Sequence, residues 1–208
     1  GYTLTGSRRP LSNSILSYSG ATDRNTGVTW GGVTSNGVTL GLSHDEGGVD
    51  GVWASLGQHW LRGKNVADNH KSTAMAGYYY RLRDSADERM RPGLTLMYWS
   101  YDQDLSEYTL GQGGYYSPQQ YYSIGVPLNY AFRTANWSVS LETSVSWSHS
   151  KTDGNDLYPL HGLNSKLLSA LDQAGYELAE PLGKTSSSTS NGIGYKVQGL
   201  VERRLSDN

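Results

Sequence analysis

The sequence lacks several patterns on which common classes of protein depend. It contains no cysteine, which excludes disulfides and thiolate zinc sites. No run approaches the roughly 20 apolar residues that a membrane-spanning helix requires. A formal net charge of -2 over 208 residues gives no basic footprint for DNA or RNA. We therefore expect neither a disulfide scaffold nor a helical membrane protein, and no nucleic-acid partner.

Charged residues are also scarce, at 17% of the chain, and apolar residues make up only 36%. A disordered chain with so little hydrophobic content usually carries more charge and few aromatic residues. This chain instead contains 16 Tyr, 6 Trp and 26 Gly. That mixture favours an all-β protein with many turns and half-exposed strands.

Motifs that would indicate catalysis or metal binding are missing as well. The five histidines stand apart from one another, and none has a partner at the spacing of a metal ligand pair. No Gly-x-Ser-x-Gly elbow occurs. The glycine-rich stretch 111–114 does not open a helix after a strand, as a phosphate-binding loop would. We therefore expect no enzyme activity, no metal and no cofactor.

Alternation with a period of two runs through most of the chain. In residues 138–150, SVSLETSVSWSHS, apolar side chains alternate with serines and with Glu142. Such a pattern predicts strands that have one apolar and one polar face. With weaker runs near residues 2–8, 14–19 and 27–34 included, we count about ten strands.

The longer connections are expected at residues 61–71, 104–120 and 151–189. The last of these contains leucines that share one helix face, which predicts a short helix over residues 163–174. Pro118 lacks a backbone donor, so we expect it to lie outside any central strand.

Aromatic residues stand at the ends of the apolar runs. Tyr122 and Tyr130 bracket one run, and Trp137 and Trp147 bracket another. Rings at both ends of an apolar band are typical of strands that cross a membrane. A band of about 11 residues also fits a tilted spanning strand. We therefore predict an antiparallel transmembrane β-barrel, with a soluble, carbohydrate-binding β-sandwich as the alternative.

In such a barrel the serine-rich faces would line a wet interior. Hydroxyl groups are small and neutral, and they both donate and accept hydrogen bonds. They suit the passage of a neutral, polyhydroxylated solute. A plain pore lining without any preference for a solute is the alternative.

Residues 111–132, GQGGYYSPQQYYSIGVPLNYAF, resemble a block of the C-terminal outer-membrane domain in the cellulose synthase operon C family. Residues 17–43 and 145–160 fit the same domain, so the resemblance extends over essentially the whole chain. It implies a 16-stranded barrel of the bacterial outer membrane, which exports cellulose or a related β-1,4-glucan. In this family a periplasmic scaffold of helical repeats precedes the barrel.

Because no repeat scaffold and only about ten strands are visible, we interpret residues 1–208 as an incomplete fragment of one barrel domain. The resemblance implies three kinds of partner: the glucan chain, outer-membrane lipid, and the periplasmic and inner-membrane components of the cellulose synthase complex. It also implies a role in biofilm formation. An outer-membrane barrel enzyme acting on lipid or polysaccharide remains an alternative function.

A glucan offers flat C–H faces for aromatic rings and hydroxyl groups for hydrogen bonds. By parity with their apolar neighbours, certain side chains are expected to face the interior and contact it: Trp53, His59, Tyr79, Trp99, Tyr101, Glu142, Lys196, Gln198 and Glu202. A register slip of one residue would reverse every side chain, so a place at the barrel rim is the alternative for each ring. Glu142 is expected to pair with Arg81 or Lys196. The tyrosine block at 115–122 is equally interpretable as an anchor for a loop.

Overall fold

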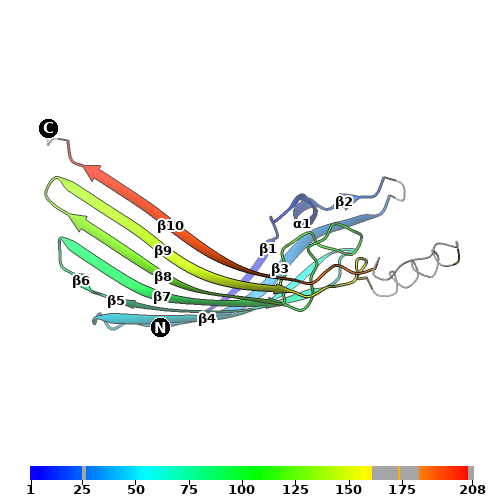
Figure 1. The fold of residues 1–208 in the computed structure, drawn as a ribbon, viewed down its shortest axis with the longest axis horizontal. Coiled ribbons are helices and arrows are strands. Elements are labelled where there is room, and N and C mark those ends of the chain that lie inside the picture. The colour runs from blue at the N-terminus through cyan, green and yellow to red at the C-terminus, as the bar shows by residue number, and fades with distance from the viewer. Residues whose placement is uncertain (25–26, 161–172, 174–182, 206–208) are drawn as a thin grey trace.

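The computed structural model describes residues 1–24, 27–160, 173 and 183–205, and these residues form one curved antiparallel sheet (Figure 1). The expected helix at 163–174 lies outside these residues, apart from residue 173. The strands are β1 (Tyr2–Pro10), β2 (Ala21–Thr22), β3 (Thr29–His44), β4 (Asp50–Lys64), β5 (Asn69–Tyr80), β6 (Arg83–Asp84), β7 (Glu88–Tyr101), β8 (Gln120–Arg133), β9 (Trp137–Thr152) and β10 (Ser188–Arg203), with helix α1 at Ile15–Ser19.

The strands follow one another in sequence order across the sheet, β1-β3-β4-β5-β7-β8-β9-β10. The two-residue strand β2 pairs with β3, and the two-residue strand β6 pairs with β7. The prediction of an all-β, antiparallel fold of about ten strands is therefore confirmed. The sheet is open, and β1 and β10 are its edges.

Cross-strand register places most of the exposed aliphatic side chains on one face, which we call the apolar face. One row across it reads Leu42, Ala54, Ala76 and Leu96 on four successive strands. The serines of β9 lie on the opposite face, which we call the polar face. Val145 is 59% exposed and Trp147 is 41% exposed, so no described part of the chain covers the apolar face there. Both faces of 138–150 are thus oriented as its alternation predicts.

Aromatic residues form two belts on the apolar face, one near each end of the strands. Near the longer connections lie Trp60, Tyr98, Tyr122 and Trp147, and near the short turns lie Tyr78, Tyr80, Tyr130, Phe132 and Trp137. From β4 to β9, the positions of the rings in both belts shift along the strands in the same direction. The apolar runs between them contain Val, Leu, Ile and Ala. Among the described residues, no helix is long and apolar enough to cross a membrane.

Connection lengths differ between the two ends of the sheet. Short turns join β3 to β4, β5 to β7 and β8 to β9, whereas α1 and the loop 102–119 lie at the other end (Figure 1). The prediction of a long connection at 61–71 is wrong. β4 and β5 extend into that range and leave only residues 65–68 between them.

The strand predicted near residues 14–19 is also wrong, because this segment forms α1. Ser14 caps the helix with a capping box, in which its Oγ accepts from the Ser17 backbone N–H at 3.1 Å. Gly20 ends the helix with a φ of 85°, a conformation that favours glycine. These local hydrogen bonds outweigh the weak alternation of the segment.

The hydrophobic core lies on the polar face, at the end of the longer connections. It consists of Val33, Leu61, Val66, Leu105 and Tyr115. Two of these residues, Leu105 and Tyr115, belong to loop 102–119, which packs them against the sheet. They are therefore buried without a second layer of strands. Pro118 lies in this loop outside β8, as its missing backbone donor predicts.

Asn69 connects this loop to β5, and only 1% of the residue is exposed. Its side-chain nitrogen donates to the Gln103 carbonyl at 2.8 Å and to the Tyr115 hydroxyl at 3.1 Å. Its Oδ1 accepts from the backbone N–H groups of His70 at 3.1 Å and Gln103 at 3.2 Å. Burial raises the pKa of the Tyr115 hydroxyl, which therefore stays neutral at physiological pH.

Further side chains fasten loop 102–119 to two other connections. The hydrogen bonds run from Asn155 Nδ2 to the Asp104 carbonyl at 2.7 Å, from Gln112 Nε2 to the Asp156 carbonyl at 2.9 Å, and from Ser14 Oγ to the Gly114 carbonyl at 2.8 Å. The tyrosine block identified in the sequence therefore includes buried loop anchors. Tyr115, Ser117 and Pro118 are all buried.

At the opposite end, Arg81 and Asp45 join the β3–β4 turn to the end of β5. Arg81 Nη2 lies 2.5 Å from Asp45 Oδ2, and the Tyr79 hydroxyl donates to the same carboxylate. The hydrogen bond from Tyr79, the Gly47 backbone N–H and Arg81 together lower the pKa of Asp45 to about 2. This contact holds two turns together at the short-turn end.

We predict that Asn69→Ala loosens loop 102–119. The substitution leaves buried donors and acceptors without partners, which costs about 2 kcal/mol or more and raises the open population of the loop roughly 30-fold. Limited proteolysis of the full-length protein in detergent should show faster cleavage within 102–119. Asn129→Ala, at an exposed position on the polar face, is the control; equal cleavage of both variants would contradict this role of Asn69.

We also predict an acid-sensitive contribution from Asp45. Its pKa is lowered in the folded state, so its stabilisation is present above the unfolded value of 3.8 and is lost as the pH falls towards about 2. Unfolding midpoints measured between pH 5 and pH 2 should therefore decline less steeply in Tyr79→Phe and Arg81→Gln. A decline identical to that of the unsubstituted protein would show that the contact does not act in this way.

Candidate functional site: the polar face of the sheet

All nine side chains predicted to face the interior belong to the polar face. Their positions alternate with the exposed apolar residues of the same strands, and their cross-strand partners are glycines, serines and other polar-face residues. Trp53 and His59 lie on β4, Tyr79 on β5, and Trp99 and Tyr101 on β7. Glu142 lies on β9, and Lys196, Gln198 and Glu202 lie on edge strand β10. The polar face is the candidate site.

Trp53 lies across a glycine of the neighbouring strand. A Cβ atom added at Gly77, its cross-strand partner, would meet the indole ring. The ring therefore rests flat against the backbone of β5, with its other face turned away from the sheet. Tyr79 covers Gly51 and His59 covers Gly37 in the same way. Glycine is needed at these three places because any larger side chain would displace a ring.

Trp99 is placed differently from Trp53. Its ring stacks on Tyr121 of β8, with centroids 3.9 Å apart and planes 6° apart. From β5, on the other side of β7, Lys71 Nζ lies 5.1 Å from the Trp99 centroid. Because its neighbours come from strands on both sides, Trp99 is held between them and directs its edge, not its face, away from the sheet.

Tyr121 and Lys71 were not among the residues predicted from the sequence. The signal for Tyr121 was its parity, because it alternates with Tyr122 and Ile124 of the apolar face. Tyr101, which was predicted, contacts the loop rather than open space. Its ring lies 5.8 Å from that of Tyr115 and packs against the hydrophobic core.

Glu142 pairs with Lys196, whose Nζ lies 3.0 Å from Glu142 Oε2. This confirms one of the two expected partners; Arg81 instead binds Asp45. Gln198 lies directly opposite Glu142 on β10, and Glu202 lies opposite Ser138. These polar groups occupy the half of the face nearer the short turns.

The middle of the polar face carries small side chains. Moving across the sheet from Trp53, one row consists of Gly77, Thr95, Gly125, Ser146 and Gly194. These small residues leave a shallow surface that carries the hydroxyl groups of Thr95 and Ser146. It can accept hydrogen bonds from, and donate them to, a sugar-like molecule without a strong charge. Among the described residues, no group of three or more His, Asp or Glu side chains is arranged to hold a metal ion.

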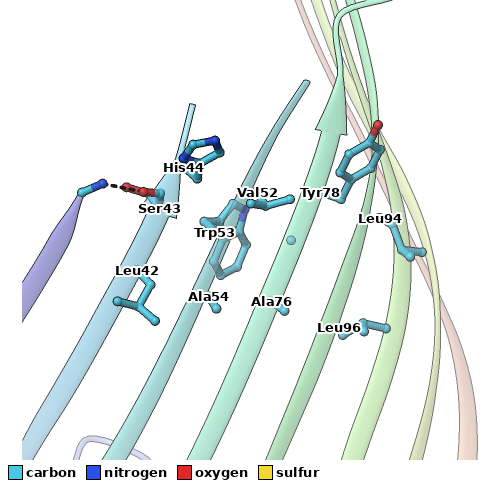
Figure 2. Close-up of a pocket in the computed structure, with 12 residues that line it drawn as sticks. Leu42, Ser43, His44, Val52, Trp53, Ala54, Ala76, Tyr78, Leu94 and Leu96 are labelled. Carbon is cyan, nitrogen blue, oxygen red and sulfur yellow. Dashed lines mark hydrogen bonds between the residues drawn. The ribbon is translucent and has the colours of Figure 1, made fainter. Parts of the chain in front are cut away.

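The apolar face also has a depression, over β3, β4, β5 and β7. Figure 2 shows Ala54 and Ala76 between the larger side chains of Leu42 and Leu96, in one row across the four strands. The depression has a volume of about 520 Å³. Its lining is almost entirely apolar, so it does not resemble the polar face.

Comparison with known proteins supplies the family. The model of the cellulose synthase operon protein C C-terminus matches residues 1–208. Cellulose synthase operon protein C of Salmonella typhimurium (strain LT2) is 46% identical over 210 residues, which cover 100% of this chain and 17% of the relative. The protein of the same name from Escherichia coli (strain K12) is 45% identical, with 100% and 18% covered.

A more distant relative, from Xanthomonas axonopodis pv. citri, is 34% identical over 97% of this chain and 14% of its own length. The chain therefore spans less than a fifth of the length of these curated relatives. The names of these relatives assign them to a cellulose synthase operon. On its sequence and its all-β fold, the chain belongs to the family of the cellulose synthase operon protein C C-terminus.

Proposed function

We propose that this chain forms part of an outer-membrane channel through which a bacterial β-1,4-glucan, cellulose or a close relative, leaves the cell. The observation that carries the proposal is the pair of aromatic belts on an otherwise apolar, uncovered face. Such belts place amphipathic rings at two membrane interfaces, with lipid between them. A soluble sandwich would cover this face with a second sheet.

The spacing of the belts supports a membrane of outer-membrane thickness. On β9, Trp137 and Trp147 are ten residues apart, which is about 33 Å of strand at roughly 3.3 Å per residue. With a strand tilt of about 40°, the distance across the membrane is about 25 Å, the height of the apolar band of such barrels. The steady shift of both belts from β4 to β9 is what tilted strands require.

An open sheet cannot lie in hydrocarbon, because the unpaired backbone groups of its edges would have no partner. We therefore propose that strands outside residues 1–208 pair with β1 and β10 and close the barrel. The greater length of the relatives leaves ample chain for this. In bacterial barrels the turns are short on the periplasmic side and longer outside, so α1 and loop 102–119 would face the exterior.

The polar face then lines the route of the polymer. The indole of Trp53 offers a flat surface to the C–H face of a glucose ring, and the neighbouring hydroxyl groups exchange hydrogen bonds with its hydroxyls. The channel has no reaction to catalyse, because the glucan is pushed through it by polymerisation at the inner membrane. Partners are the periplasmic and inner-membrane components of the cellulose synthase complex, and the channel serves the biofilm matrix.

The orientation of the faces can be tested with single cysteines, because residues 1–208 contain none. In cells whose full-length protein is otherwise free of cysteine, Ser146→Cys should react with a small water-soluble maleimide. Val145→Cys, on the apolar face, should be protected by lipid and should react only after detergent extraction. The reverse pattern would contradict both the membrane and the channel.

The part of the polar face that is proposed to contact the polymer, which we call the glucan track, can be tested by measuring cellulose secretion. We expect Trp53→Ala to reduce secretion several-fold at normal levels of assembled protein, because the stacking of a sugar ring is lost, which we place at about 1 kcal/mol. Gly77→Val should have a similar effect by displacing the same ring. Trp60→Ala, on the apolar face, is the matched control. Unchanged secretion in both Trp53→Ala and Gly77→Val would rule out the stacking surface.

A further inference from the structure

A cluster of basic side chains, none of which has an ion-pair partner among the described residues, lies on the polar face next to loop 102–119. His59, Lys71 and Tyr101 occupy one cross-strand row on β4, β5 and β7. Arg9 lies on β1 in the adjoining row, opposite Ser35. Gly37 lies on β3, the strand between β1 and β4, and has no side chain that would separate Arg9 from His59. Arg9 also interacts electrostatically with both His59 and Lys71.

No ion pair of the described residues includes Arg9, His59 or Lys71. Neither its own row nor the two rows beside it on the polar face contain Asp or Glu. The ion pairs of the described residues use other cations, namely His44, Arg62, His70, Arg81, Arg91, Lys151 and Lys196. Glu142 is also far from the cluster. It lies eight residues along β9 from Ser150, the β9 residue in the row of Trp99. Lys196 forms an ion pair with Glu142 and neutralises its charge.

The aromatic neighbours add to the positive character of the cluster. Lys71 Nζ lies 5.1 Å from the Trp99 centroid and 5.3 Å from the Tyr101 centroid, which fixes the ammonium group on the sheet. Trp99 and Tyr121 stack face to face and so present their edges to the open side. The edge of an aromatic ring carries partial positive charge, and the indole N–H is a donor. The whole surface is therefore suited to an anion.

We propose that Arg9, His59 and Lys71, with the ring edges of Trp99 and Tyr121, bind a saccharide that carries a negatively charged group. The inference rests on the proposed function, because it places a selective position on the route of the polymer. Trp53 and the small polar residues contact the neutral glucan backbone. The cation cluster contacts carboxylate, phosphate or sulfate groups attached to it, just before the polymer reaches loop 102–119.

The test compares two hexasaccharides with the same β-1,4 backbone, one of glucose and one of glucuronic acid. Binding to the full-length protein in detergent is measured by tryptophan fluorescence and calorimetry at low salt. The glucuronic acid hexamer should bind at least tenfold more tightly than the glucose hexamer, because charge-assisted hydrogen bonds are the stronger ones. At 0.5 M salt this preference should shrink, because the ions screen the attraction.

Lys71→Gln should reduce the preference to less than threefold. Lys64→Gln removes the same charge from the exposed end of the neighbouring strand β4 and should leave the preference unchanged. Trp53→Ala should weaken both hexamers equally. Inorganic phosphate at the concentration of the hexamer should not displace it, because phosphate lacks the sugar contacts; displacement would overturn a saccharide site.

The two proposals fail in different ways. If the glucose hexamer binds and the glucuronic acid hexamer binds no more tightly, the cation site is wrong and the glucan track stands. A preference that survives Lys71→Gln also overturns the cation site. If neither hexamer binds, both proposals are wrong.

Discussion

Every feature of this structure depends on the cross-strand register of one antiparallel sheet. Because side chains alternate strictly along a strand, a shift of one residue in any pair would exchange its two faces. The observed register keeps the two faces distinct across all eight long strands. On β9, for example, Val145 and Trp147 lie on one face, and Ser144 and Ser146 lie on the other. The aromatic belts, the hydroxyl-rich track and the cation cluster all follow from that single alignment.

Within this register, glycine decides how the rings of the polar face are arranged. Trp53 lies flat because Gly77 opposite it has no side chain, and the ring then protects backbone that the glycine leaves exposed. Trp99 has Tyr121 and Thr73 as its cross-strand partners and stands upright in a stack. The same residue type thus offers a flat surface in one row and a positive edge in another. In our proposals, the flat ring contacts the neutral sugar and the ring edge contacts the anionic group.

Burial is concentrated where the chain leaves the sheet. The hydrophobic core and Asn69 lie at the end that carries α1 and loop 102–119, while the strands between have exposed apolar side chains. Such a distribution is poor for a soluble domain, since folding in water is driven by removing apolar area from it. The distribution is consistent with the membrane location that we propose for this sheet.

Alternation alone determined the β class, the two faces and the side of each of the nine candidate residues, since parity is a local property of the chain. Local reasoning failed where short-range hydrogen bonds outweigh a weak pattern: Ser14 and Ser17 convert a supposed strand into α1. Only the tertiary structure decided that Lys196 neutralises Glu142 and that Tyr101 packs on the loop. It also places Arg9, His59 and Lys71 in adjoining rows, with no ion-pair partner among the described residues. These contacts join residues up to about 60 positions apart, and their geometry is set by strand pairing, which no local pattern encodes.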